Sequence, residues 1–205
     1  MRTVTIIDYG AGNILSIVNA INFLGYAAKV SSKPDDIKNS EIVILPGVGS
    51  FYRAMLKINE LGIDEAIKEI AFIKKRKILG ICLGMQLMAN IGNEENRIQG
   101  LGLINGEIKS LNLVTNLQLP HIGFNLVENH KDNILYHKLK NYYFYFVHSF
   151  FLDISSGVQD IKLDYCSYGK KFICSFQNQN IFGTQFHPEK SQTNGLNLLK
   201  NFLEL

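Results

Sequence analysis

Cysteine is scarce in this sequence, tryptophan is absent, and no hydrophobic run is long. The three cysteines, Cys82, Cys166 and Cys174, are odd in number and widely spaced, which argues against a disulfide framework and against a CxxC metal site. No stretch approaches the roughly 20 apolar residues that cross a membrane, and the start of the chain lacks the cleavage-site pattern of a signal peptide. We therefore expect a cytoplasmic protein.

A strong excess of charge is also missing. The 21 lysines and arginines nearly balance the 18 acidic residues, which gives a formal net charge of +3. This is too weak a basic character for a nucleic-acid-binding protein. With 205 residues, of which 46% are hydrophobic, the chain can bury one sizeable core. We expect a single domain over residues 1–205.

The first hundred residues alternate short apolar runs with helical periodicity. Strands are expected at 3–8, 41–47 and 77–82, and a helix follows each of them after a glycine-containing turn. This alternation is typical of a parallel sheet that is covered by helices on both faces. In such sheets, ligands bind at the carboxyl ends of the strands.

The pattern changes after residue 100. Strand-like segments at 100–111, 142–152, 171–177 and 180–187 follow one another with few helices between them, and residues 177–180 form a plausible hairpin turn. The chain closes with an apolar helical stripe from residue 194 onward. The predicted fold class is α/β, with a mostly parallel central sheet, helices on both faces and an antiparallel extension.

One cysteine has unusual neighbours. The segment "GICLG" (80–84) places Cys82 between an expected strand and an expected helix, in the pattern of a nucleophile elbow with sulfur in place of oxygen. Small flanking residues allow a sharp turn, and the start of a helix favours the thiolate. The amide of Leu83 can face a developing oxyanion. The structural alternative is that Cys82 is a small buried hydrophobic residue.

A nucleophile needs a base, and the segment "GTQFHPEKS" (183–191) supplies one. In an extended chain, His187 and Glu189 point to the same side, so Glu189 can orient the imidazole while its other nitrogen faces Cys82. A metal site is the rival use of these residue types, but no fourth ligand at metal spacing is present. No metal or cofactor is expected.

These segments resemble a known family. The motifs "ILPGVGSF" (44–51), "GICLGMQLM" (80–88) and "QFHPEKS" (185–191) are similar to those of the class I glutamine amidotransferases. The closer resemblance, which includes "IDYGAGNILSI" (7–17) and runs from end to end, is to the glutaminase subunit of imidazole glycerol phosphate synthase. It implies a heterodimer with a cyclase subunit, which uses the ammonia to make imidazole glycerol phosphate and AICAR in histidine biosynthesis.

The resemblance implies a Cys-His-Glu triad. Cys82 corresponds to the nucleophile that forms a glutamyl thioester, His187 to the general acid and base, and Glu189 to the residue that orients it.

Further site residues follow from the same resemblance. Gln86 and Glu94 correspond to positions that bind the substrate glutamine, with the adjacent Glu95 as an alternative to Glu94. His148 and Ser149 would lie beside the substrate's α-carboxylate. In the turn "PGVG", Val48 and Gly49 would supply the second oxyanion donor, and the glycines would permit a peptide flip.

One departure concerns the partner. The family usually carries "PHMGWN" at the subunit contact, whereas this chain has "PHIGFN" (120–125), so that Phe124 replaces the tryptophan and its N–H donor. Phe51 and Tyr52 are further candidates for the interface, with a place in the core as the alternative. The departure leaves open a paralogue that supplies ammonia for acetamidino-sugar synthesis. Readings of another class are a catalytically dead binding subunit and a cysteine peptidase.

Overall fold

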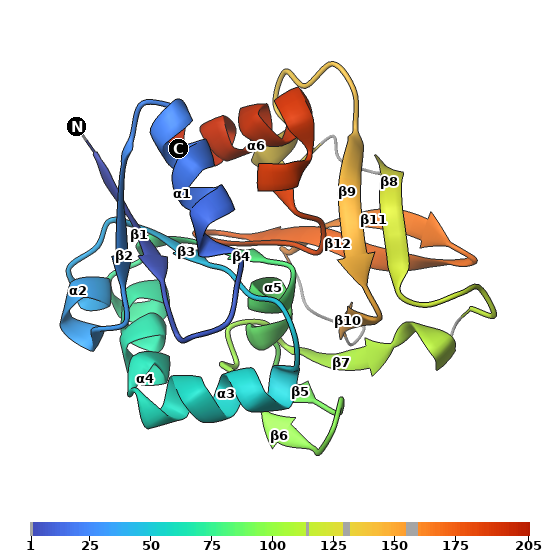
Figure 1. Cartoon of the computed structure of the whole chain (residues 1–205), viewed down its shortest axis with the longest axis horizontal. Helices are drawn as coiled ribbons and strands as arrows, with labels where there is room; N and C mark the ends of the chain where they lie inside the picture. The colour runs from blue at the N-terminus through green and yellow to red at the C-terminus, as the bar shows by residue number, and fades with distance from the viewer. Residues whose placement is uncertain (1, 114, 129–131, 155–159) are drawn as a thin grey trace.

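The computed structural model describes residues 2–113, 115–128, 132–154 and 160–205 (Figure 1). Its strands form one mixed sheet with the order β2-β1-β3-β4-β13-β12-β10-β7-β5-β6. The first five strands of this order run parallel. They are β2 (Ala27–Ser31), β1 (Thr3–Ile7), β3 (Ile42–Leu45), β4 (Lys77–Ile81) and β13 (Ile181–Thr184).

The rest of the sheet is mainly antiparallel. It continues through β12 (Lys170–Asn178), β10 (Phe150–Ile154), β7 (Gly106–Ser110), β5 (Ile91–Gly92) and β6 (Ile98–Gln99). Off this path, β11 (Lys162–Tyr168) pairs with β12 and with β8 (His121–Glu128), and β8 pairs with β9 (Tyr143–His148). The predicted fold class, a parallel sheet with an antiparallel extension, is confirmed.

Helices cover both faces of the parallel strands (Figure 1). One face carries α1 (Ile14–Phe23) and α6 (Gln192–Glu204), and the other carries α3 (Phe51–Glu60), α4 (Ile63–Lys68) and α5 (Leu83–Leu87). The remaining helical segments are α2 (Pro34–Lys38), a π-helical continuation of α4 at η1 (Glu69–Ile73), and the 3-10 turns η2 (Leu111–Leu113), η4 (Ile134–Tyr136) and η5 (Pro188–Lys190). None of the helices in the described ranges has the length and apolar character needed to cross a lipid bilayer.

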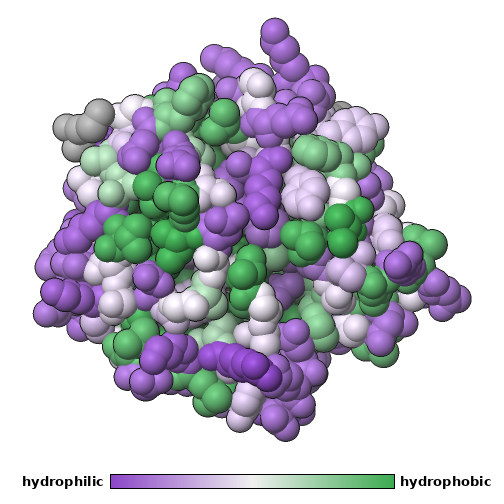
Figure 2. All heavy atoms as spheres, in the orientation of Figure 1, coloured by the Kyte–Doolittle hydropathy of each residue, from purple (hydrophilic) through white to green (hydrophobic). Residues whose placement is uncertain are grey.

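The core has two halves, one on each side of the sheet. Alternate residues of β3 contribute to opposite halves: Val43 and Leu45 pack with α3 and α4, whereas Ile42 and Ile44 pack with α1 and α6. The face of the molecule in Figure 2 shows hydrophobic side chains in patches that hydrophilic ones interrupt. Because β3 sends side chains into both halves of the core, this strand, which is apolar at every position, is buried on both faces, as its sequence predicts.

Several elements differ from the sequence-based expectation. The segment 142–152, expected as one strand, is two strands, β9 and β10, which have different partners and are separated by Ser149. The hairpin turn expected at 177–180 is present, but only Gln179 and Asn180 form it, because Asn178 and Ile181 are already paired between the two strands. The strands β2, β8 and β11 and the helix α2 were not predicted.

The connections of the parallel strands place three chain segments together. Strand β4 lies between β3 and β13, and all three run in the same direction. Their carboxyl ends therefore meet at one edge of the sheet, where the chain leaves β3 at Pro46, β4 at Cys82 and β13 at Gln185.

Candidate active site

Cys82 occupies a strained turn between β4 and α5. Its backbone has φ 53° and ψ −111°, in a region that side-chain-bearing residues rarely adopt. The turn is possible because both neighbouring glycines meet backbone at close range: a Cβ on Gly84 would lie 1.8 Å from the Leu45 carbonyl oxygen, and one on Gly80 would lie 2.7 Å from the Gly84 carbonyl oxygen. The sequence pattern "GICLG" is thus a steric requirement of this bend.

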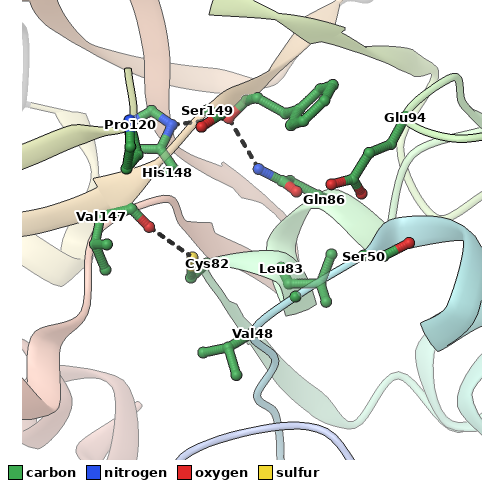
Figure 3. Close-up of a pocket in the computed structure, with 12 residues that line it drawn as sticks. Val48, Ser50, Cys82, Leu83, Gln86, Glu94, Pro120, Val147, His148 and Ser149 are labelled. Carbon is green, nitrogen blue, oxygen red and sulfur yellow. Dashed lines mark hydrogen bonds between the residues drawn. The ribbon is translucent and has the colours of Figure 1, made fainter. Parts of the chain in front are cut away.

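The thiol lies at the wall of a cavity and is 6% exposed. Its sulfur is 3.9 Å from the Val147 carbonyl oxygen and 3.7 Å from Nε2 of Gln185 (Figure 3 draws the contact with Val147). The cavity has a volume of about 430 Å³. The predicted site residues that line it are Val48, Gly49, Cys82, Leu83, Gln86, Glu94, His148 and Ser149.

His187 and Glu189 do not line the cavity but are buried next to Cys82. Nδ1 of His187 is 2.8 Å from Oε1 of Glu189, and their side chains are 3% and 1% exposed. The sequence suggested that the two residues meet along an extended strand. In the structure they meet across the 3-10 turn η5. Nε2 of His187 makes no hydrogen bond to any residue that the structure describes.

The electrostatic environment keeps this imidazole charged. Burial alone would lower the pKa of His187, but the adjacent Cys82 sulfur and the Glu189 carboxylate outweigh it and raise the pKa from 6.5 to about 10. At neutral pH the residue is therefore an imidazolium, placed to donate a proton from the nitrogen that Glu189 does not hold.

The turn after β3 is anchored at both ends. The Tyr9 hydroxyl donates to the Pro46 carbonyl oxygen at 2.9 Å, and the Phe51 N–H donates to Oε2 of Glu94 at 2.6 Å. Between these anchors, the N–H groups of Val48 and Gly49 donate to no acceptor among the described residues. Gly49 has φ +96°. The turn therefore has unpaired amides on a backbone that glycine makes permissible, and both Val48 and Gly49 line the cavity.

The structure separates the two adjacent acidic candidates. Glu94 lines the cavity together with Cys82, whereas Glu95 forms an exposed ion pair with Arg53, 3.2 Å apart. Burial raises the pKa of Glu94, the neighbouring Glu95 adds to this, and the hydrogen bond from Phe51 opposes it. Glu94 is thus the carboxylate at the cavity, where its side chain points toward Gln86 (Figure 3).

Gln86 has both of its N–H donors engaged. Its Nε2 donates to the Phe150 carbonyl oxygen at 2.9 Å and to Oε1 of Gln185 at 3.0 Å (Figure 3 shows the first contact). Gln185 was missed by the sequence reasoning, although it lies two residues before His187. A buried glutamine carries no charge and belongs to no spacing pattern, so only its contact with Cys82 identifies it.

His148 is a buried, neutral residue. Because carbonyl oxygens only accept, its Nδ1 donates to the Phe150 carbonyl oxygen at 2.8 Å, and its Nε2 then accepts from Nδ1 of His121 at 3.0 Å. Burial lowers the pKa of His148 to about 3 and that of His121 to about 4. His148 therefore has no N–H left for a carboxylate, whereas Ser149 also lines the cavity and its hydroxyl makes no hydrogen bond to the described residues.

The interface candidates divide between surface and core. Phe124 is 44% exposed and packs against Tyr145, with ring centroids 5.6 Å apart. Ile122, Leu126 and Tyr143 are exposed around them on β8 and β9. Phe51, in contrast, is fully buried beneath Gly92 and Gly100, so the suggestion that it lies at an interface is wrong. Tyr52 is only partly buried.

The other two cysteines are core residues. Cys166 and Cys174 are 0% exposed, and burial raises the pKa of both thiols, that of Cys166 to about 12. Such thiols are poor nucleophiles. Within the described ranges, no group of three or more His, Cys, Asp or Glu side chains is arranged to hold a metal ion.

Comparisons with known proteins identify relatives of this chain. "Imidazole glycerol phosphate synthase subunit HisH 1" of Campylobacter jejuni subsp. jejuni serotype O:23/36 (strain 81-176) is 44% identical over 203 residues, which cover 98% of this chain and 100% of that protein. "Imidazole glycerol phosphate synthase hisHF, chloroplastic" of Arabidopsis thaliana is 40% identical over 98% of this chain and 34% of its own length. A crystal structure of a glutamine amidotransferase superposes with a TM-score of 0.74 at 17% identity, over 98% of this chain and 97% of that one.

The family profile named "Glutamine amidotransferase class-I" matches residues 5–205. The match includes the turn after β3, the elbow at Cys82 and the segment of His187 and Glu189. The chain belongs to the class I glutamine amidotransferase family.

Proposed function

We propose that this chain is the glutaminase subunit of an imidazole glycerol phosphate synthase, and that residues 1–205 form one glutamine amidotransferase domain. The observation that carries the proposal is the site itself: Cys82 on a strained elbow, beside an imidazolium that Glu189 holds. The names of the relatives favour histidine biosynthesis over the acetamidino-sugar pathway. The intact triad argues against a dead binding subunit.

In the first step, the Cys82 thiolate attacks the side-chain amide carbon of glutamine. The oxygen of that amide becomes an oxyanion, which the N–H of Leu83 and an N–H of Val48 or Gly49 stabilise. His187 gives its proton to the nitrogen as the C–N bond breaks. Ammonia leaves, and a glutamyl thioester remains on Cys82.

In the second step, His187 is neutral and acts as a base. It takes a proton from water, the hydroxide attacks the thioester carbon, and the C–S bond breaks to release glutamate and the Cys82 thiolate. Glu189 holds Nδ1 throughout and so keeps Nε2 directed toward the reacting atoms.

The substrate's polar end is held by the other cavity residues. The Glu94 carboxylate suits the α-ammonium group of the substrate. Both N–H donors of Gln86 are engaged within the protein, so Gln86 contacts the substrate through Oε1, which accepts a hydrogen bond from a substrate N–H group. Ser149 donates its hydroxyl to the α-carboxylate. His148 shapes the wall, since both of its nitrogens are occupied within the protein.

The ammonia is consumed by a cyclase subunit in a heterodimer. The exposed apolar face of β8 and β9 around Phe124 is the surface we assign to this partner. In the relative from Arabidopsis thaliana, named hisHF, the matching region covers 34% of a longer chain. Apolar and aromatic side chains of this kind commonly anchor protein interfaces.

The proposal is tested by reconstituting the chain with a cyclase subunit of the same class. Cys82→Ala is expected to reduce glutamine-dependent product formation by at least about 10³-fold, because the nucleophile is lost. Synthesis from added ammonium salts should continue at the wild-type rate, since the cyclase is unaltered. Both rates are followed by product absorbance or chromatography.

Loss of both activities in Cys82→Ala would show that the residue supports assembly and not chemistry. Retention of glutamine-dependent synthesis would refute the assigned mechanism. As a matched control, Cys174→Ala removes a buried cysteine away from the cavity and should leave the ratio of the two activities unchanged.

A further inference from the structure

Gln185 contacts the sulfur but is not part of the triad. It follows β13 directly, is 0% exposed, and its backbone N–H donates to the Cys174 carbonyl oxygen at 2.7 Å. Its side chain passes under the elbow, where Nε2 lies 3.7 Å from the Cys82 sulfur. It does not line the substrate cavity.

The orientation of the Gln185 amide is determined by its neighbours. The Phe150 carbonyl oxygen only accepts, so the Gln86 atom that contacts it is the nitrogen. The same nitrogen contacts Gln185, which must therefore present its oxygen to Gln86. The Gln185 NH₂ group is then left to face the Cys82 sulfur. In this chain of contacts, Gln86 donates to Phe150 and to Gln185, and Gln185 donates to the Cys82 sulfur, so that each donor has an acceptor.

We propose that Gln185 is a positioning residue that donates a hydrogen bond to the Cys82 thiolate, with its amide locked by Gln86. This rests on the proposed function, in which that thiolate is the nucleophile. The two side-by-side contacts of the sulfur differ in direction. The Val147 carbonyl oxygen can only accept a hydrogen bond from the thiol, whereas the Gln185 NH₂ group donates one to the sulfur.

A further titratable group near the sulfur is Tyr9, which follows β1. Burial and the adjacent Cys82 raise the pKa of Tyr9, so it stays a neutral phenol whose hydrogen is given to Pro46. It therefore does not supply the sulfur with a hydrogen bond. Gln185 is the uncharged side chain that does so among the residues the structure describes.

The test is the pH dependence of Cys82 alkylation by iodoacetamide, followed by mass spectrometry of the peptide on the isolated subunit. This readout needs no glutaminase activity, so it separates failure of this inference from failure of the proposed function. Gln185→Glu keeps an acceptor for Gln86 and removes the donor to sulfur. The alkylation rate at pH 7 is expected to fall about tenfold, and the profile to move about one unit toward alkaline pH.

Three companion measurements complete the test. Gln185→Met removes both functions of the amide and should move the profile in the same direction, which keeps the inference testable if Gln185→Glu does not fold. Thr184→Val changes the preceding buried residue, whose hydroxyl has no partner among the described residues, and should leave the profile in place. In the reconstituted enzyme, Gln185→Glu should lower kcat and leave the KM for glutamine nearly unchanged.

An unshifted alkylation profile in folded Gln185→Glu and Gln185→Met would overturn the inference. So would an equal shift in Thr184→Val, because that would indicate a general effect of packing. A lowered melting temperature without a change of profile would likewise assign Gln185 a structural role only.

Discussion

At the elbow, single residues have steric roles as well as chemical ones. Cys82 has a left-handed φ, and the adjacent chain can approach it only because Gly80 and Gly84 have no side chains. The Leu45 carbonyl oxygen occupies the space that a Gly84 side chain would need. The position of the Cys82 thiol thus depends on the absence of a Cβ atom at Gly84.

Gly84→Ala is expected to destabilise the protein by about 2 kcal/mol or more, because a Cβ 1.8 Å from backbone must displace either α5 or the end of β3. Glutaminase activity should fall together with stability, since the displacement moves Cys82 itself. Urea unfolding and initial rates measure the two effects.

Gly25→Ala is the control for Gly84→Ala. Gly25 has φ +85° but no heavy atom within 4 Å of an added Cβ, so only backbone strain of about 1 kcal/mol applies there. Equal destabilisation of the two variants, with activity retained in both, would contradict the steric account.

Residues with a recognisable chemical pattern were predictable, and those defined by contacts were not. Cys82 and the pair His187 and Glu189 stand in short motifs of recognisable residue types, although the pair meets across a 3-10 turn and not along the extended chain that was expected. The role of Gln185 depends on a sulfur 103 positions away, and the neutral state of His148 depends on His121. Sequence alone could not choose between Glu94 and Glu95, because their difference is the direction in which each points.

At the scale of elements, His187 is held by three segments. Its backbone N–H donates to the Tyr145 carbonyl oxygen in β9 at 2.9 Å. Ser191, which precedes α6, accepts from the Tyr145 N–H at 2.9 Å and donates to the His187 carbonyl oxygen at 2.6 Å. The strand, the 3-10 turn and the helix are thus tied together by one buried hydroxyl.

Ser191→Ala is expected to cost about 1–3 kcal/mol of stability, because the partly buried Tyr145 N–H loses its acceptor. The kcat for glutamine hydrolysis should also fall several-fold, since the His187 backbone loses one of its contacts. Thr193→Ala, at an exposed position in the first turn of α6, is the matched control and should change stability by less than about 0.5 kcal/mol. Wild-type behaviour of Ser191→Ala in both measurements would refute this assignment.

Among the parallel strands, the predicted ones are those that are buried on both faces. Strand β3 is apolar at every position, and β1 and β4 are buried at every position except the first, whereas β2 is an edge strand with Lys29 and Val30 exposed. Strand β8 contains glycine and polar residues because one of its faces is open to solvent. Where the environment is mixed, the period of the sequence is too weak to reveal a strand.

At the scale of the whole molecule, buried titratable groups make stability depend on pH. Burial lowers the pKa values of His121 and His148 to about 4 and about 3. Below pH 6.5 these histidines therefore bind protons in the unfolded chain but not in the native state, and acidification lowers the stability. Burial raises the pKa of Asp164 to about 6, which opposes one histidine between pH 4 and 6. His187 acts in the alkaline range, because it retains its proton in the native state up to about pH 10.

Stability is therefore expected to be greatest near pH 6.5 and to fall on both sides. Two histidines less one aspartate leave a net difference of about one proton, or about 1.4 kcal/mol per pH unit, on acidification from pH 6 to 4. Above pH 6.5, the proton that His187 retains in the native state gives a decline of similar size, and at more alkaline pH the protons retained by the buried thiols of Cys166 and Cys174 make it steeper. Urea unfolding as a function of pH measures the profile.

His121→Gln, which keeps an N–H donor for His148, should bring the acid slope close to zero and leave the alkaline slope unchanged. An acid slope equal to that of the wild type would show that His121 is not responsible.

The turn from Pro46 to Phe51 is fastened at either end, to Tyr9 on one side and to Glu94 on the other. A rotation of the peptide planes between these fastenings can proceed without disturbing the strand before it or the helix after it. Control over when ammonia is made can thus reside in a few dihedral angles, and such control could be lost or gained in evolution while the architecture of the protein stays the same.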